Sequence, residues 1–273
     1  MTVGDGATIA YDVRGAGTEV PLLLLRPSAG GMKLWGRFRD ECARHLRVLS
    51  FDPRGQGASS KAPLWWSTDE MAEDAIALLD FLGLESANVF GLSIGGMVAM
   101  RLAIDHPRRI GKLVVASTVD HGHIPSLRSF WEGARVVEAI ADPSVSYTAG
   151  AVEATTECHH AAVVEMVEAA GAEPSRPRTL VSNTVAALRF DMREEVKAIH
   201  RPTLVLAGAR DELTPPALAV ELAGKIERAE LTILDAGHDV CVDQPVEAAH
   251  AVVRFLTGVA PARHDQTRNE ARP

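Results

Sequence analysis

Cysteine is scarce in this chain, with only Cys42, Cys158 and Cys241 among 273 residues. The number is odd and no pair has the C-x-x-C spacing, which argues against a disulfide framework and against a zinc site. Reduced thiols in the cytoplasm are the simpler interpretation. With 47% hydrophobic and 23% charged residues, the chain is expected to fold as an ordinary globular protein without metal or disulfide cross-links.

Long apolar runs and excess positive charge are missing as well. The N-terminal segment has no basic region followed by an apolar one, so no secretory signal is evident. The run Leu22 to Leu25 is far shorter than the roughly 20 residues that span a bilayer. A formal net charge of -8 disfavours nucleic acid as a partner, because phosphates are bound by clustered Lys and Arg. We therefore expect a cytoplasmic protein with a small-molecule partner and no membrane contact; the sequence leaves a homo-oligomer open.

The chain does contain an alternation of short apolar runs with longer amphipathic segments. Strands are predicted at residues 8–13, 20–25, 47–51, 87–90, 110–117, 203–207 and 230–234. Helices are predicted at residues 35–46, 69–82, 96–106, 216–226 and 245–256, with Thr68 and Gly83 at the ends of the second. Strands that alternate with helices of this length predict right-handed crossovers and a mostly parallel sheet.

The alternation is interrupted in the middle of the chain. No Val- or Ile-rich strand occurs there, and Ala-rich amphipathic stretches follow one another at residues 126–141, 150–170 and 178–189. We expect a helical lid, residues 121–199, inserted into one core made of residues 1–120 and 200–258. Residues 259–273 are polar and aperiodic, and a disordered tail is expected there.

A candidate nucleophile, Ser93, lies in Gly91-Leu92-Ser93-Ile94-Gly95. A G-x-S-x-G match alone is weak, because an ordinary glycine-rich turn between a strand and a helix can match it. Here an apolar strand precedes the motif and a helix follows it. This context predicts a nucleophile elbow, in which small flanking residues permit a strained backbone that exposes the serine oxygen.

A serine hydroxyl needs a base to accept its proton, and two later loops supply candidates. His238 ends the loop after the last predicted strand and is the candidate base, while Asp211 follows the strand before it and is the candidate acid. The chain order Ser, Asp, His is the one that enzymes with this elbow use. Glu212 could be the acid instead, and Asp211 could merely cap the next helix. Asp235 lies nearer His238 in sequence, but at a strand end, where a structural role is favoured.

Four segments together resemble the α/β-hydrolase superfamily over nearly the whole chain. In the family's order and spacing, they are the nine residues that begin at Phe51 (FDPRGQGAS), the nine that begin at Gly91 (GLSIGGMVA), Gly208 to Asp211 (GARD), and Gly237-His238. The resemblance implies an eight-stranded, mostly parallel sheet with helices on both faces and a helical lid inserted after strand 6. The elbow and the Asp211-x-x-Thr214-Pro215-Pro216 loop are most similar to 3-oxoadipate enol-lactonases and related esterases.

The resemblance also implies an oxyanion hole formed by two backbone amides, which map to Ser28 and Ile94. The family usually has His-Gly after the first buried strand, whereas this chain has Arg26-Pro27. Pro27 has no N–H to donate, so Ser28 or Ala29 would supply the first amide. Arg26 could bind an anionic group of the substrate or anchor the loop through an internal ion pair, and the structural role is favoured.

The residues and the resemblance predict a serine hydrolase of small carboxylic esters or lactones that needs no metal and no organic cofactor. Trp131 is a candidate substrate contact, and Phe130, Met166 and Phe190 are further candidates. All four could equally be core residues of the lid. Haloalkane dehalogenases and epoxide hydrolases are disfavoured, because they carry Asp where this chain carries Ser93. A cofactor-free haloperoxidase, a non-hydrolytic cyclase or lyase, and a ligand-binding receptor are the alternatives on the same fold.

Overall fold

A single sheet of seven strands organises the part of the chain that the structure, a computed structural model, describes: residues 1–17, 20–26, 32–61, 66–122, 177–259 and 261. The strands are β1 (Tyr11–Arg14), β2 (Leu22–Leu25), β3 (Val48–Phe51), β4 (Ala87–Leu92), β5 (Ile110–Ala116), β6 (Thr203–Gly208) and β7 (Ala229–Leu234). Their order is β1-β3-β2-β4-β5-β6-β7. Only the β1 and β3 pair is antiparallel.

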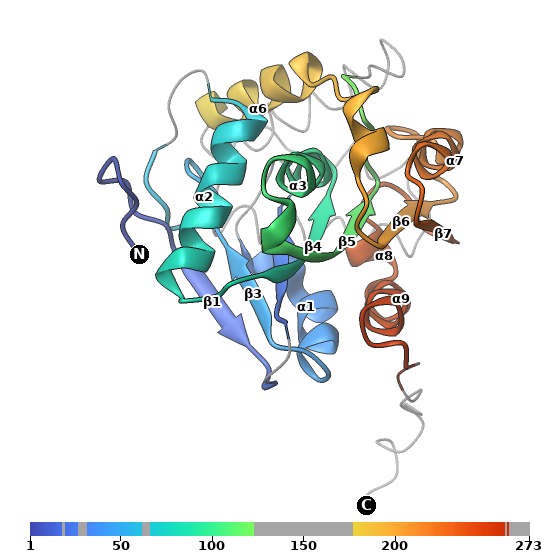
Figure 1. Cartoon of the computed structure of the whole chain (residues 1–273), viewed down its shortest axis with the longest axis horizontal. Helices are drawn as coiled ribbons and strands as arrows, with labels where there is room; N and C mark the ends of the chain where they lie inside the picture. Colours follow the sequence, from blue (N-terminus) through green and yellow to red (C-terminus); the bar gives the residue numbers. More distant parts are fainter. Residues whose placement is uncertain (18–19, 27–31, 62–65, 123–176, 260, 262–273) are drawn as a thin grey trace, which may run out of the picture.

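Helices cover both faces of this sheet (Figure 1). They are α1 (Gly36–Ala43), α2 (Thr68–Phe81), α3 (Ile94–Asp105), α6 (Pro177–Arg189), α7 (Pro216–Lys225), α8 (Val240–Asp243) and α9 (Pro245–Thr257), with the short 3-10 turns η1 (Met32–Trp35), η2 (Pro107–Arg109) and η3 (Glu195–Ala198). Helices α1, α8 and α9 bury their apolar residues against one face, and α2, α3 and α7 against the other.

Strand β2 shows why the chain adopts this layered arrangement. Its four leucines are all buried. Successive side chains of a strand point to opposite faces, so Leu22 and Leu24 join the core beside α1 and α9, whereas Leu23 and Leu25 join the core beside α2 and α3. A continuous apolar run is therefore what a strand covered on both faces requires.

Helix α2 begins one residue earlier than the sequence predicts. Ser67, and not Thr68, is the N-cap. Its hydroxyl accepts a hydrogen bond from the amide of Glu70, and the Glu70 carboxylate accepts one from the amide of Ser67. This reciprocal capping box satisfies two amides that the first turn would leave unpaired. The chain leaves the helix through Gly83 at φ 65°, a left-handed conformation that glycine adopts without steric cost.

The expected count of eight strands is wrong for the described residues, which form seven. The difference lies at the N-terminus, where the segment before β1 makes only an isolated bridge between Thr2 and Thr8. The tight turn between them, with Gly6 at φ 84°, leaves too few residues to extend that bridge into a strand. No helix in the described ranges is both long and apolar enough to cross a membrane.

Strands β5 and β6 are neighbours in the sheet although a long segment separates them in sequence: Leu113 pairs with Thr203. The predicted helix at residues 178–189 is α6, and Trp66 Nε1 donates to Asn183 Oδ1 at 3.0 Å, which ties α6 to the segment before α2. The stretches 126–141 and 150–170 lie outside the described residues. The lid and the domain boundaries that follow from it stay predictions, as does the tail.

A buried ion pair fastens the loop after β3 to α2. Arg54 donates to both carboxylate oxygens of Asp74, from Nε at 2.8 Å and from Nη2 at 2.7 Å. Asp74 is only 3% exposed. Burial raises the pKa of this carboxyl, and the charge of Arg54 opposes that rise.

We predict that Arg54→Met lowers the free energy of unfolding by about 3 kcal/mol at pH 7, because it leaves Asp74 buried without its cation. The loss should shrink as the pH falls through the raised pKa of Asp74, because protonation removes the buried charge. Urea unfolding of both proteins tests this. Arg14→Met, which removes an exposed pair with Asp40, is the matched control and should cost less than about 1 kcal/mol. Equal losses in the two variants would contradict the prediction.

Candidate active site

Ser93 lies at the turn between β4 and α3 with a strained backbone. Its φ of 55° and ψ of −122° are unusual for a residue with a side chain, and such conformations cost about 1 to 3 kcal/mol. Hydrogen bonds to the neighbouring strand hold it: the Ser93 amide donates to the carbonyl of Ala116 at 2.9 Å, and the Thr118 hydroxyl donates to the carbonyl of Ser93 at 2.7 Å. The last residue of β5 and the segment that follows it thus fix both sides of the turn.

The two glycines of the motif are required by close backbone approaches. A Cβ on Gly91 would lie 2.1 Å from the carbonyl oxygen of Gly95, and a Cβ on Gly95 would lie 2.3 Å from that of Leu25. Both distances are shorter than any van der Waals contact, and the atoms are backbone that cannot rotate away. The glycines of the G-x-S-x-G pattern therefore reflect close backbone packing around Ser93.

We predict that Gly95→Ala destabilises the protein by about 2 kcal/mol, because the added methyl group forces the start of α3 away from β2. Gly224→Ala is the matched control: it lies in α7 and nothing approaches its Cβ position within 4 Å, so the higher helix propensity of alanine should raise stability by up to about 1 kcal/mol. Thermal melting of the two variants measures both effects. A stable Gly95→Ala protein would show that the approach to Leu25 is not tight.

His238 joins Ser93 to Asp211. Its Nε2 lies 3.1 Å from Ser93 Oγ, and its Nδ1 lies 2.9 Å from Asp211 Oδ2. The loop that carries His238 is held by Asp243, whose carboxylate accepts the amide of Gly237 at 2.6 Å. The imidazole is 21% exposed and the Asp211 side chain is fully buried. The three residues that the sequence singles out thus form one continuous hydrogen-bonded chain.

Among the described residues, the hydrogen bonds to the Asp211 carboxylate come from its own loop and from His238. Oδ1 accepts the amides of Leu213 at 2.9 Å and Thr214 at 2.8 Å, and Oδ2 accepts the Thr214 hydroxyl at 2.6 Å in addition to His238. Burial raises the pKa of Asp211, but the hydrogen bonds and charge of His238 and the donors of Thr214 outweigh it and keep the pKa below its usual value. Asp211 is therefore an anion at neutral pH.

The contact between Asp211 and His238, which lowers the pKa of the carboxyl, raises the pKa of the imidazole. Burial lowers the pKa of the imidazole, whereas the hydrogen bond to Asp211 and the negative charges of Asp211, Asp239 and Asp243 raise it. The net direction is upward from the ordinary value of about 6.5. The imidazolium form of His238 is thus stabilised by the neighbouring carboxylates.

Two family models match the chain: one for the α/β hydrolase fold covers residues 20–136, and one described as TAP-like protein covers residues 184–267. A 3-oxoadipate enol-lactonase of Acinetobacter baylyi is 32% identical over 244 residues, which are 85% of this chain and 87% of that protein. The chain belongs to the α/β-hydrolase superfamily.

Two further relatives agree with this assignment. The solved structure of an enol-lactonase from Burkholderia xenovorans matches with a TM-score of 0.78 and 27% identity, over 93% of this chain and 98% of that one. A protein of Caulobacter segnis named carbamate hydrolase RutD is 29% identical over 94% of this chain and 100% of its own length. These names support a hydrolase, and they differ in the bond that is hydrolysed.

The structure distinguishes Asp211 from Glu212 and Asp235, the other carboxylates considered as partners of His238. Glu212 is exposed and lies outside the hydrogen-bonded chain. Asp235 forms an ion pair with Arg210 at the surface and its backbone carbonyl accepts Gln244 Nε2, so it has the structural position expected for a strand end. Of the two neighbouring carboxylates in the loop after β6, the structure places only Asp211 against His238.

The remaining predicted site residues have different outcomes. Ile94 is the first residue of α3, where amides have no partner within the helix. Arg26 is 4% exposed, and its guanidinium lies 5.3 Å from the ring centroid of Trp35. That cation–π contact agrees with an anchoring role for Arg26. Ser28 and Trp131 lie outside the described residues, as do Phe130 and Met166.

Two residues of the site were not singled out by the sequence analysis. Thr118 bonds to the backbone of Ser93 because the register of β4 against β5 brings them together, and no local motif announces that pairing. Thr214 is part of the loop that resembles the enol-lactonases, so its place near Asp211 could have been inferred. Within the described ranges, no cluster of three His, Cys, Asp or Glu residues could hold a metal ion.

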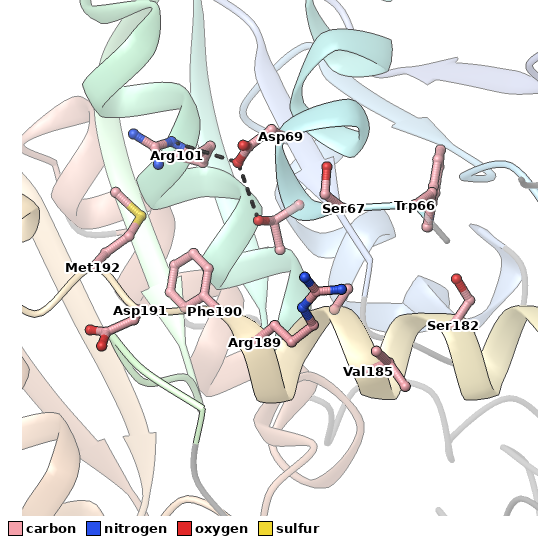
Figure 2. A pocket seen from close by; sticks show the side chains of 12 residues that line it. Trp66, Ser67, Asp69, Arg101, Ser182, Val185, Arg189, Phe190, Asp191 and Met192 are labelled. Carbon is pink, nitrogen blue, oxygen red and sulfur yellow. Dashed lines mark hydrogen bonds and ion pairs between the residues drawn. The ribbon is translucent and has the colours of Figure 1, made fainter. Parts of the chain in front are cut away.

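A cavity of about 320 Å³ lies between the start of α2, the middle of α3 and the end of α6 (Figure 2). Trp66, Arg101 and Phe190 are among its lining residues, and none of Ser93, Asp211 and His238 is. Phe190, a candidate for the substrate pocket, therefore contributes to this separate cavity and is 6% exposed.

Proposed function

We propose that the protein is a serine hydrolase that cleaves a carboxylic ester or lactone of a small molecule through an acyl-enzyme. The observation that carries the proposal is the hydrogen-bonded chain from Ser93 Oγ through both nitrogens of His238 to Asp211 Oδ2, with distances of 3.1 and 2.9 Å. Nucleophile, base and orienting carboxylate are each within hydrogen-bond reach of the next, which is the geometry that covalent acyl transfer requires.

In this mechanism Ser93 Oγ attacks the carbonyl carbon while His238 Nε2 accepts its proton. Asp211 holds Nδ1 as the N–H tautomer and stabilises the imidazolium that forms. The tetrahedral intermediate collapses, and His238 gives its proton to the leaving alkoxide. Water then loses a proton to the same nitrogen, attacks the acyl-enzyme, and regenerates Ser93 with release of the carboxylic acid. In a lactone, acid and alcohol leave as one molecule.

The oxyanion would be stabilised by backbone amides. Ile94 supplies one, because it follows the nucleophile and begins α3, a helix of 12 residues whose amino end carries partial positive charge. The second donor is proposed to be Ser28, in the loop after β2. Arg26 directly follows β2, and its contact with Trp35 favours a structural role for its charge.

The class of scissile bond is the open part of the proposal. The lactonase relative supports an ester or lactone, and the relative named carbamate hydrolase makes the C–N bond of a carbamate the second candidate. Both bonds suit the same Ser-His-Asp chemistry, since each presents a carbonyl to attack. A matched panel of small esters, lactones and carbamates, ranked by kcat/KM, decides between them.

We predict that a fluorophosphonate probe labels the native protein stoichiometrically at Ser93 and does not label heat-denatured protein. Ser93→Ala should abolish labelling and lower kcat by about four powers of ten or more, because nucleophile and base act as a unit. Intact-mass spectrometry and steady-state rates measure the two effects.

Ser117→Ala is the matched control for this labelling. Ser117 is the other described non-glycine residue with positive φ, at 45°, and it is buried close to the elbow. It should keep both labelling and turnover. Near-native turnover by Ser93→Ala would contradict the covalent mechanism and favour a non-hydrolytic cyclase, a lyase or a haloperoxidase-like enzyme.

We predict that kcat/KM rises with pH through an apparent pKa above about 6.5, the ordinary value of histidine. The sign follows from the contacts: His238 must be neutral to accept the serine proton, and Asp211, Asp239 and Asp243 hold its pKa above that value. Asp211→Asn should lower this pKa and reduce kcat by orders of magnitude. Rates from pH 5 to 9 measure it, and a flat profile with chemistry rate-limiting would refute the role of His238.

A further inference from the structure

We propose that Thr214 is a positioning residue whose hydroxyl shares Asp211 Oδ2 with His238 and thereby limits the basicity of the imidazole. The inference rests on the proposed function, in which His238 is the base. It assigns a task to a side chain that neither the elbow motif nor the triad pattern includes.

The contacts form a closed triangle. Thr214 Oγ1 lies 2.6 Å from Asp211 Oδ2 and 3.3 Å from His238 Nδ1, and the third side, from His238 Nδ1 to Asp211 Oδ2, is 2.9 Å. One carboxylate oxygen therefore receives two side-chain donors. The hydroxyl has a single proton, and the shorter distance assigns it to Asp211, because Nδ1 carries its own proton when it bonds to the carboxylate.

The hydroxyl is not needed to orient the carboxylate. Oδ1 already accepts the amides of Leu213 and Thr214, at 2.9 and 2.8 Å, and these fix the plane of the group from the loop backbone. Removing the hydroxyl should therefore leave Asp211 in place and change only the charge available at Oδ2. This separates an electrostatic role of Thr214 from a purely structural one.

The direction of the effect follows from the two distances. A proton donated to Oδ2 at 2.6 Å stabilises the carboxylate and weakens its attraction for the imidazolium. A hydrogen bond from Nδ1–H to the lone pair of Oγ1 would raise the pKa of His238. The distance between these two atoms is 3.3 Å, which is beyond the usual N–H···O range. The first contact dominates, so Thr214 lowers the pKa of His238. The charges of Asp239 and Asp243, which also act on His238, lie at the two ends of α8 and stay unchanged.

The test compares Thr214→Val, which keeps the shape and removes the hydroxyl, with Thr214→Ser, which keeps the hydroxyl. The pKa of His238 is measured in the full chain by NMR titration of its imidazole, which needs no substrate. The acid limb of kcat/KM is measured on the best ester of the panel. Thr257→Val is the matched control, since its hydroxyl donates to the carbonyls of Val253 and Val259 and not to a residue of the site.

We expect Thr214→Val to raise the pKa of His238 by about half a unit in both measurements, with KM unchanged within about twofold. Thr214→Ser and Thr257→Val should keep the wild-type value. A pKa in Thr214→Val that is equal to or below the wild-type value overturns the proposal. So does a rise in Thr214→Ser as large as that in Thr214→Val, because the hydroxyl would then not be its cause.

Failure of the proposed function is distinguishable from failure of this inference. If no ester, lactone or carbamate is hydrolysed in a Ser93-dependent manner, the function is wrong, while the NMR titration still reports whether Thr214 acts on His238. Thermal melting confirms that each variant is folded before its titration is compared with the wild type.

Discussion

The strained backbone of Ser93 is the constraint on which the rest of the site depends. A positive φ at this serine is held by hydrogen bonds at its amide and its carbonyl, both to the segment at the end of β5. That conformation costs free energy, which the packed parallel sheet around it offsets. The hydroxyl is thereby presented at the amino end of α3 and toward His238, where neither a regular strand nor a regular helix would direct it.

The electrostatics of the site follow from what surrounds Asp211. A fully buried carboxylate is ordinarily costly, and its own loop compensates with two amides and a hydroxyl before His238 adds the fourth hydrogen bond. The Asp211 carboxylate is therefore already ionised and held in a fixed position. The imidazole can then gain and lose a proton without any reorganisation around it, which is the condition for electrostatic preorganisation.

The sequence was sufficient where a residue's position follows from its own strand, turn and helix. Ser93 and His238 were predicted in this way, because each lies in the short loop after a predicted strand. The choice between Asp211 and Glu212 depended on which side chain the loop turns inward, and the structure answers it with the amides of Leu213 and Thr214.

Long-range pairings were not readable from the sequence. Thr118 meets Ser93 only through the register of two strands. The count of eight strands has a different origin: it came from the family resemblance, whereas the apolar runs of this chain predicted seven, the number that the described residues form.

The chain leaves the core after β5 and returns to it before β6 at two neighbouring points. The amide of Met192 donates to the carbonyl of Asp120, and that of Gly122 to the carbonyl of Phe190, so both ends of the excursion after β5 are bonded to each other. Lys225 of α7 anchors the same point through Asp120. Loop-closure entropy grows only by about 0.6 kcal/mol for each doubling of length. We therefore expect insertions and deletions between these ends to cost little free energy, so that the length of this part of the chain can vary while the core that carries the site is retained.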